Sequence, residues 1–167
     1  MENEARSKAF LAKVSAHQNI VHKVSMVYGD TGDEREDLKQ EILLQLWKSW
    51  DSFDGCSAFS TWMYRVALNT AISFRRRKRR PPVQSELMRQ HDTQYRDAAN
   101  SQDLKLLYQA ISTLSAIEKA IILQWLDERS YGDIADTLGM SVKNVSVRLV
   151  RIRSKLTRLI REASQSE

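Results

Sequence analysis

The sequence contains little cysteine, proline or glycine. Its one cysteine, Cys56, excludes an internal disulfide and fits a reducing compartment. One thiol and three scattered histidines also lack the ligand spacing of a zinc site. The 167 residues include only five glycines and two adjacent prolines, Pro81 and Pro82. A chain with so few turn-forming residues is expected to be mostly helical.

Long apolar runs are missing as well. No stretch of about 18 apolar residues occurs, so we expect no helix that crosses a bilayer. The first residues, MENEARSKAF, carry acids and no apolar core, so a signal peptide is not expected. The three histidines, His17, His22 and His91, have no partner at catalytic spacing, and no glycine-rich phosphate loop exists. We therefore expect a cytoplasmic protein that is not an enzyme and holds no cofactor or metal.

Positive charge is present in blocks, although the formal net charge is only +5. Residues 75–80 are six consecutive cations, and residues 143–161 contain seven cations and no acid. Two separated basic blocks indicate two contacts with a polyanion such as nucleic acid. The alternative for each block is a solvated charged face.

The distribution of apolar residues predicts an all-α fold of two small helical domains joined by a flexible linker. We expect a first domain at 1–80, a linker at 81–101 and a second domain at 102–167. The linker begins with the two prolines and lacks a sustained apolar stripe.

The first domain is expected to contain three helical stretches. The early stretch has apolar residues at helical spacing and stops at Gly29, and a second helix covers about 34–50. A turn at Asp54-Gly55 precedes a third helix, which Ser57 or Ser60 could cap and which continues into the arginine block. The second domain should contain helices at about 102–113, 116–128, 130–138 and 142–161.

The segment SYGDIADTLGMSVKNVSVRLVRIRSKL has the pattern of a helix-turn-helix. Gly139 can adopt the positive φ that a helix exit requires, and Ser141 can cap the helix that follows. An apolar arc on that last helix should face the core: Val142, Val145, Leu149, Ile152 and Leu156.

The opposite side of the last helix is expected to read DNA, and we call it the reading face. It comprises Lys143, Asn144, Ser146, Val147, Arg148, Val150 and Arg151. Valines on a polar face suit contacts with thymine methyls, while Lys143 or Arg151 could read purine edges or bind phosphate. Further phosphate contacts are expected from Arg148, Arg153 and Lys155. The alternative is a solvated basic helix with exposed valines.

The second and third helices each show two different sides. On the second, an inward arc comprises Leu38, Ile42, Leu46 and Ser49, and a separate stripe suits protein docking. This docking stripe comprises Asp37, Gln40, Glu41, Leu44 and Lys48. The third helix is apolar around most of its girth and has a narrow polar stripe of Thr61, Arg65, Asn69 and Arg76. Its Trp62 is expected in the core, with base stacking as the alternative.

Three segments in this order, EDLKQEILLQLWKSWDSF, FSTWMYRVALN and the helix-turn-helix, resemble the sigma factors of bacterial RNA polymerase. Nearly the whole chain is similar to the extracytoplasmic function group, which keeps only regions 2 and 4. The resemblance implies core RNA polymerase (its β and β′ subunits), promoter DNA and an anti-sigma factor as partners. It also implies that the docking stripe binds the β′ clamp helices and that the last helix enters the −35 element.

The resemblance further implies that residues 52–80 handle the −10 element, with a base flipped from the non-template strand captured by the loop at 53–58. The implied −10 residues are Phe53, Asp54, Gly55, Cys56, Ser57, Thr61, Arg65, Asn69 and Arg76. Two alternatives stay open from the residues alone. The chain could be an ordinary helix-turn-helix regulator whose first half dimerises or senses a ligand, and Cys56 could be a redox sensor rather than inert.

Overall fold

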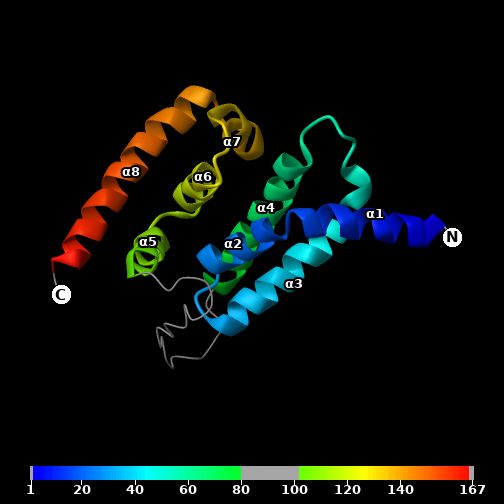
Figure 1. Ribbon diagram of the computed structural model, residues 1–167, viewed down its shortest axis with the longest axis horizontal. Helices are drawn as coiled ribbons and strands as arrows, with labels where there is room; N and C mark the ends of the chain where they lie inside the picture. The colour runs from blue at the N-terminus through cyan, green and yellow to red at the C-terminus, as the bar shows by residue number, and fades with distance from the viewer. Residues whose placement is uncertain (1, 80–101, 166–167) are drawn as a thin grey trace. The chain divides into compact units, whose positions relative to one another are not determined.

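The computed structural model describes residues 2–79 and 102–165, and within these residues every regular element is helical. The chain divides into two compact units, the first built from α1–α4 and the second from α5–α8 (Figure 1). This confirms the all-α expectation. The expected linker at 81–101 lies outside the described residues, as does Arg80. None of the described helices is long and apolar enough to span a membrane.

The first unit contains four α-helices and one short 3-10 turn. They are α1 (Glu2–Ala16), α2 (Gln18–Tyr28), α3 (Gly32–Lys48), η1 (Trp50–Ser52) and α4 (Phe59–Arg79). The early helical stretch is broken at His17, whose φ of −125° departs from helical values, and it ends with Gly29 as its C-cap as predicted. Because α4 begins at Phe59, Ala58 occupies the capping position. The expectation that Ser57 or Ser60 caps this helix is therefore wrong, since Ser57 precedes that position and Ser60 lies inside the first turn.

The core of the first unit forms where α2 and α4 lie side by side (Figure 1). The predicted inward arc of α3 is buried at Leu38, Ile42 and Leu46, whereas Ser49 follows the end of α3 and is half-buried. Helix α4 is buried around most of its girth, as its apolar residues predict. Trp62 is buried in this core, so the expectation of a packing role is confirmed.

The second unit consists of α5 (Gln102–Ser112), α6 (Ala116–Leu126), α7 (Tyr131–Leu138) and α8 (Val142–Ser164). The long helix α8 packs against the other three (Figure 1). Its buried side is Val145, Leu149, Ile152 and Leu156, as predicted. The prediction that Val142 lies on the same buried arc is wrong, because this residue is 52% exposed. It is the first residue of the helix, and the buried contacts begin one turn later at Val145.

Candidate polymerase and nucleic-acid interfaces

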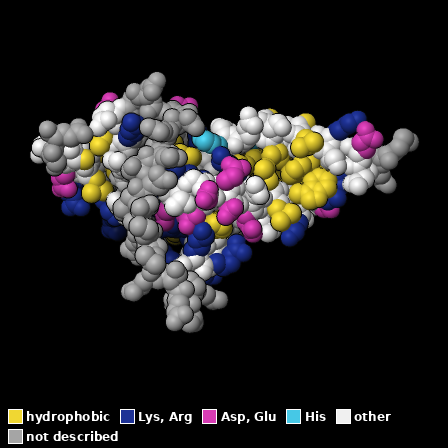
Figure 2. All heavy atoms as spheres, turned by 90° about the horizontal axis from the view of Figure 1, so that it is seen from below, with side chains coloured by type: hydrophobic (Ala, Val, Ile, Leu, Met, Phe, Trp, Pro, Cys, Tyr) yellow, Lys and Arg dark blue, Asp and Glu magenta, His cyan; other side chains and the backbone are white. Residues whose placement is uncertain are grey.

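The docking stripe is a single accessible side of α3. Asp37, Gln40 and Lys48 are exposed, Glu41 is half-buried, and the Leu44 side chain is 47% exposed. An open groove beside the stripe is lined by Asp37, Gln40, Glu41, Leu44, Phe74, Arg77 and Lys78. Figure 2 shows acidic side chains gathered near apolar ones on one face of the molecule. An exposed leucine within a charged rim has the composition of a protein-docking surface.

Ion pairs connect α3, including Glu41 of the docking stripe, to the basic end of α4. Arg77 Nη2 lies 3.4 Å from Glu41 Oε1, and Lys78 Nζ lies 2.9 Å from Glu34 Oε1. Two cations of the arginine block are therefore partly neutralised by α3. The sequence did not predict these pairs because the partners are 36 and 44 residues apart.

An aromatic cluster surrounds the base of the 53–58 loop. It comprises Phe10, Trp47, Trp50, Phe53, Phe59 and Trp62. Phe53 and Phe59, at the two ends of the loop, have ring centroids 5.3 Å apart in an edge-to-face arrangement. Such pairs add about 0.5–1.5 kcal/mol beyond the burial of their area. The loop is thus closed at its base by aromatic packing.

The top of the loop is a tight turn. The backbone N–H of Cys56 donates to Asp54 Oδ1 at 2.9 Å, and Gly55 has a φ of 77° that favours glycine. This confirms the predicted Asp54-Gly55 turn. Asp54, Gly55 and Cys56 are all exposed, so the turn presents polar groups to solvent above an apolar base.

Asp54 and Cys56 shift each other's titration in opposite directions. The hydrogen bond from the backbone N–H of Cys56 lowers the pKa of Asp54. The hydrogen bond to the Asp54 carboxylate, and then the negative charge of that carboxylate, raise the pKa of the Cys56 thiol. Reactive cysteines have lowered pKa values. The surroundings of Cys56 therefore favour a protonated, less reactive thiol over a redox sensor.

The predicted polar stripe of α4 is correct at three of its four positions. Arg65, Asn69 and Arg76 are exposed, but Thr61 is only 3% exposed. Side chains spaced four residues apart rotate by about 40° per step around a helix. Thr61 therefore lies closer in angle to buried Leu68 than to Asn69.

The exposed stripe continues through a residue that the sequence analysis missed. Ser73 is exposed and lies one turn beyond Asn69. It lines an open groove together with Glu41, Gln45, Ser49, Val66, Asn69, Thr70 and Arg77. The sequence could have indicated Ser73, because it is a polar residue four positions after Asn69.

The helix-turn-helix of the second unit has the predicted backbone. Gly139 caps α7 in the left-handed conformation, with φ 65° and ψ 37°. The N–H of Met140 donates to Ala135 O at 3.1 Å, and Ser141 Oγ accepts from the N–H of Asn144 at 3.1 Å. These bonds satisfy backbone groups at the end of α7 and the start of α8.

The reading face of α8 is open to solvent. Lys143, Asn144, Val147, Arg148, Val150 and Arg151 are exposed, and Ser146 is half-buried. The exposed fractions of Val147 and Val150 are 43% and 62%, high for apolar side chains next to a formed core. Arg148 Nε donates to Asn144 Oδ1 at 2.9 Å, a contact that orients the guanidinium. This i, i+4 pair could have been predicted from helical spacing.

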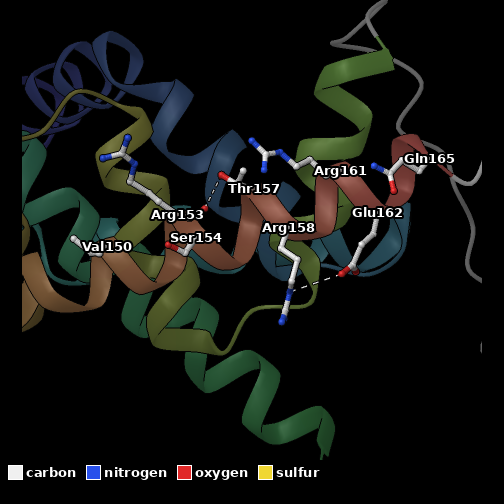
Figure 3. Close-up of a pocket in the computed structure, with 8 residues that line it drawn as sticks. All are labelled: Val150, Arg153, Ser154, Thr157, Arg158, Arg161, Glu162 and Gln165. Atoms are coloured by element: carbon white, nitrogen blue, oxygen red, sulfur yellow. Dashed lines mark hydrogen bonds and ion pairs between the residues drawn. The ribbon is translucent and has the colours of Figure 1, made fainter.

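The cationic surface extends along the second half of α8 (Figure 3). Arg153 and Arg161 extend from one side of the helix in this view and Arg158 from the other. The Arg153 guanidinium lies 4.9 Å from the centroid of Trp125, and Lys155 Nζ lies 3.7 Å from Glu118 Oε2. Arg153 and Lys155, both expected to contact phosphate, therefore also contact α6 of their own unit.

Family models match both units, and no group of three metal-ligating side chains occurs in the described parts of the chain. The model of sigma-70 region 2 matches residues 14–81, and that of sigma-70 region 4 matches residues 104–156. A region 2 followed by a region 4 with an open helix-turn-helix defines an RNA polymerase sigma factor.

Relatives specify the group. The ECF RNA polymerase sigma-E factor of Haemophilus influenzae is 32% identical, with 89% of this chain and 86% of that protein covered. The corresponding factor of Escherichia coli strain K12 is 30% identical, with 89% and 85% covered. The chain belongs to the extracytoplasmic function (ECF) group of RNA polymerase sigma factors. This assignment decides against the alternative of an ordinary helix-turn-helix regulator.

Solved structures share the fold. The sigma factor RpoE of Bartonella quintana, solved in complex with the anti-sigma factor NepR, aligns with a TM-score of 0.68 and 26% identity. That alignment covers 93% of this chain and 96% of the other. CnrH, solved with the cytosolic domain of CnrY, has the same fold with a TM-score of 0.67 and 21% identity.

Proposed function

We propose that this sigma factor uses three separate surfaces: the docking stripe for core polymerase, the 53–58 loop with the α4 stripe for the −10 element, and the reading face for the −35 element. Residues 1–80 and 102–167 are the corresponding domains, and 81–101 is the linker between them. The observation that carries the proposal is the pairing of region 2 and region 4 matches with an exposed, acid-rimmed leucine on α3.

The docking stripe suits a polymerase helix because it combines a central apolar side chain with flanking charges. Leu44 supplies apolar area, and Asp37 and Glu41 supply negative charge beside it. Buried apolar contacts provide most of the affinity at such a surface, and the surrounding charges provide orientation and partner choice. Glu41 would exchange its Arg77 partner for groups of the polymerase.

The −10 proposal rests on the architecture of the loop and α4. The exposed turn stands above packed aromatic rings and can hold a single unstacked nucleotide base. Arg65, Asn69 and Arg76 line the path of the non-template DNA strand. Capturing an unstacked base returns about 1–3 kcal/mol. Opening DNA costs about 1.4 kcal/mol per base-pair step. A single pocket cannot offset the opening of several steps, so the polymerase must supply the remaining free energy.

The −35 proposal rests on the position of the reading face at the start of α8. The N-terminal turns of a recognition helix enter the major groove. Val147 and Val150 can contact thymine methyls, and Lys143 and Arg151 can reach base edges or phosphates. The cations of the second half of α8 extend the phosphate contacts, so duplex affinity should fall steeply as salt increases.

The assignment supports the partners and the location that we propose. Core polymerase and promoter DNA are the two obligatory partners, and an anti-sigma factor is a third, since the Bartonella quintana factor was solved with one. The polymerase forms the bonds of the RNA chain, so this chain acts by recognition and not as an enzyme. Its place of action is the cytoplasm, where polymerase and chromosome meet.

The docking stripe is tested by Leu44→Arg. The substitution places a cation where the proposal needs an apolar contact, and because Leu44 is exposed the chain should still fold. We expect the variant to lose at least about 10-fold in affinity for core polymerase, the loss typical of an interface hot spot. Affinity is measured by titrating labelled chain with purified core polymerase.

The matched control is Leu11→Arg, the same substitution at an exposed leucine on α1, outside the stripe. It should bind core normally. Normal binding by Leu44→Arg, or equal loss in both variants, would remove the docking stripe from the proposal.

A further inference from the structure

Helix α1 takes part in the aromatic cluster although most of it precedes the region 2 match, which starts at residue 14. Phe10 is buried, and its ring centroid lies 5.1 Å from that of Trp47 and 5.4 Å from that of Trp50. Both contacts are edge-to-face. Phe10 therefore helps to fix the position of η1, the turn that leads into the 53–58 loop.

A forked ion pair adds orientation to this contact. Arg6 Nε donates to Asp51 Oδ1 at 3.1 Å, and Arg6 Nη2 donates to Asp51 Oδ2 at 2.8 Å. The same guanidinium lies 4.7 Å from the centroid of Trp47. A two-point bond from a planar guanidinium restricts direction as well as distance. Asp51 is the central residue of η1, two positions before Phe53.

The path from Asp51 to the loop is short and packed. Trp62 Nε1 donates to Ser52 Oγ at 3.4 Å, and the ring of Phe53 lies 5.5 Å from that of Trp62. The hydrogen bond between Cys56 and Asp54 shapes the turn but ties it to neither helix. The loop runs from η1 into α4, so the position of η1 sets where the loop begins, and η1 is held from the other side by α1.

We infer that α1 is a positioning element for base capture at the −10 element. Arg6 and Phe10 hold η1 and Phe53 so that the 53–58 loop stands at a fixed angle over α4. Arg6 itself contacts no base, so it is a positioning residue. The inference rests on the proposed function of the loop, and it adds a part of the chain to which the region 2 match does not extend.

The experiment must distinguish a positioning role of α1 from a general role in the stability of the fold. An exposed ion pair contributes little to global stability, so variants at Arg6 should fold and dock on polymerase normally. If Arg6 is a positioning residue, its loss should instead lower the preference of the holoenzyme for DNA with a base over DNA with an abasic site. Base preference, and not overall affinity, is the quantity to measure.

The test uses holoenzyme made from core polymerase and the full chain. It is titrated with fork-junction DNA whose −10 strand comes from a promoter that it selects, either intact or with one abasic site at successive positions. For the natural chain the ratio of intact to abasic affinity should be large at one position. Arg6→Ala should reduce this ratio about 3- to 10-fold, the range expected for a forked pair with a cation–π contact.

Three further variants sharpen the result. Arg6→Lys keeps the charge without the fork and should fall between the natural chain and Arg6→Ala. Exchanging the pair, as Arg6→Asp with Asp51→Arg, should restore part of the ratio. Lys8→Ala is the control, because Lys8 lies on α1 and pairs with Glu4 of the same helix. It should leave the ratio unchanged.

Different failures are separable. If the natural holoenzyme prefers a base at no position, the proposed function of the loop is wrong, and the role of α1 falls with it. If it does prefer a base and Arg6→Ala keeps the full ratio, α1 is not a positioning element although the −10 proposal stands. A parallel loss of core affinity would also overturn the inference, because it indicates a general structural role. Should Arg6→Ala unfold, Asp51→Asn replaces it and is judged by the same ratio.

Discussion

The loop at 53–58 carries the sole thiol of the chain, so the chemistry of a single residue reports on it. Asp54 shapes the turn through the backbone N–H of Cys56 and raises the pKa of the thiol at the same time. Only the thiolate is nucleophilic, so Cys56 should react slowly near neutral pH.

We predict that Asp54→Asn speeds the alkylation of Cys56. The amide can still accept the backbone hydrogen bond, but it lacks the charge that disfavours the thiolate. The profile of rate against pH should therefore move to lower pH. The measurement is the rate of reaction with iodoacetamide across the alkaline range, where no other thiol contributes. Superimposable profiles would show that the carboxylate does not control the thiol.

Glu128 is a second residue of interest, because its backbone conformation is unusual for a residue other than glycine. It lies in the turn between α6 and α7 with a φ of 58°, the left-handed region that costs a non-glycine residue about 1–2 kcal/mol. Asparagine tolerates this region better than glutamate does.

Glu128→Asn should therefore raise the free energy of unfolding by about 0.5–1 kcal/mol. Urea denaturation of the full chain gives the value. Glu162→Asn is the control, since the same change within α8 should destabilise through lower helix propensity. A lower denaturation midpoint for Glu128→Asn would contradict the assigned strain.

At the scale of elements, serine caps define the starts of α6, α7 and α8. Ser115, Ser130 and Ser141 each accept a hydrogen bond from a backbone N–H three residues ahead. At α6 the cap is reciprocal, because Glu118 Oε2 accepts from the N–H of Ser115 at 2.8 Å. That bond is the main cause that lowers the pKa of Glu118; burial opposes it and Lys155 assists it.

The Glu118 cap should make the second unit sensitive to acid. Because the folded pKa lies below the ordinary 4.5, the ionised carboxylate stabilises the fold above pH 4.5. This stabilisation is lost as the pH falls through the folded pKa. Glu118→Gln keeps an acceptor without the charge and should flatten that dependence. Urea midpoints measured from neutral to acid pH test it, and an unchanged slope would contradict it.

Local signals allowed the helix-turn-helix to be predicted well. Gly139 and Ser141 act on backbone groups within a few residues, so their effects can be predicted from the sequence. The inward and outward sides of α3 and α8 were predicted for the same reason, since burial follows helical periodicity. The errors at Thr61 and Val142 fall in the first turn of a helix, where periodicity alone does not say how far the core extends.

Contacts between distant segments could not be predicted. Arg6 and Asp51 are 45 residues apart, and Arg77 and Glu41 are 36 apart. Nothing in the pattern around Arg6 specifies which of the 21 acidic residues it meets. These ion pairs and the ring contacts around the 53–58 loop are thus properties of the packed unit. The family resemblance implied a −10 role for residues 52–80, but it did not indicate the contacts that α1 makes with η1.

At the scale of the whole molecule, two small cationic units share one chain. One captured base returns about 1–3 kcal/mol, less than the cost of opening several base-pair steps at about 1.4 kcal/mol each. We therefore propose that promoter selection is a property of the holoenzyme. The chain alone should bind promoter duplex weakly and lose that binding as salt increases, because its contacts are mostly with phosphates.

The most direct test is run-off transcription by core polymerase and the purified chain on a library of random promoter templates. The account predicts that the added chain directs initiation to templates sharing two short sequence elements at one fixed spacing, and that Leu44→Arg abolishes this selection. If the natural chain gives no more template-specific initiation than core polymerase alone, while binding duplex tightly by itself as a dimer, the account is contradicted.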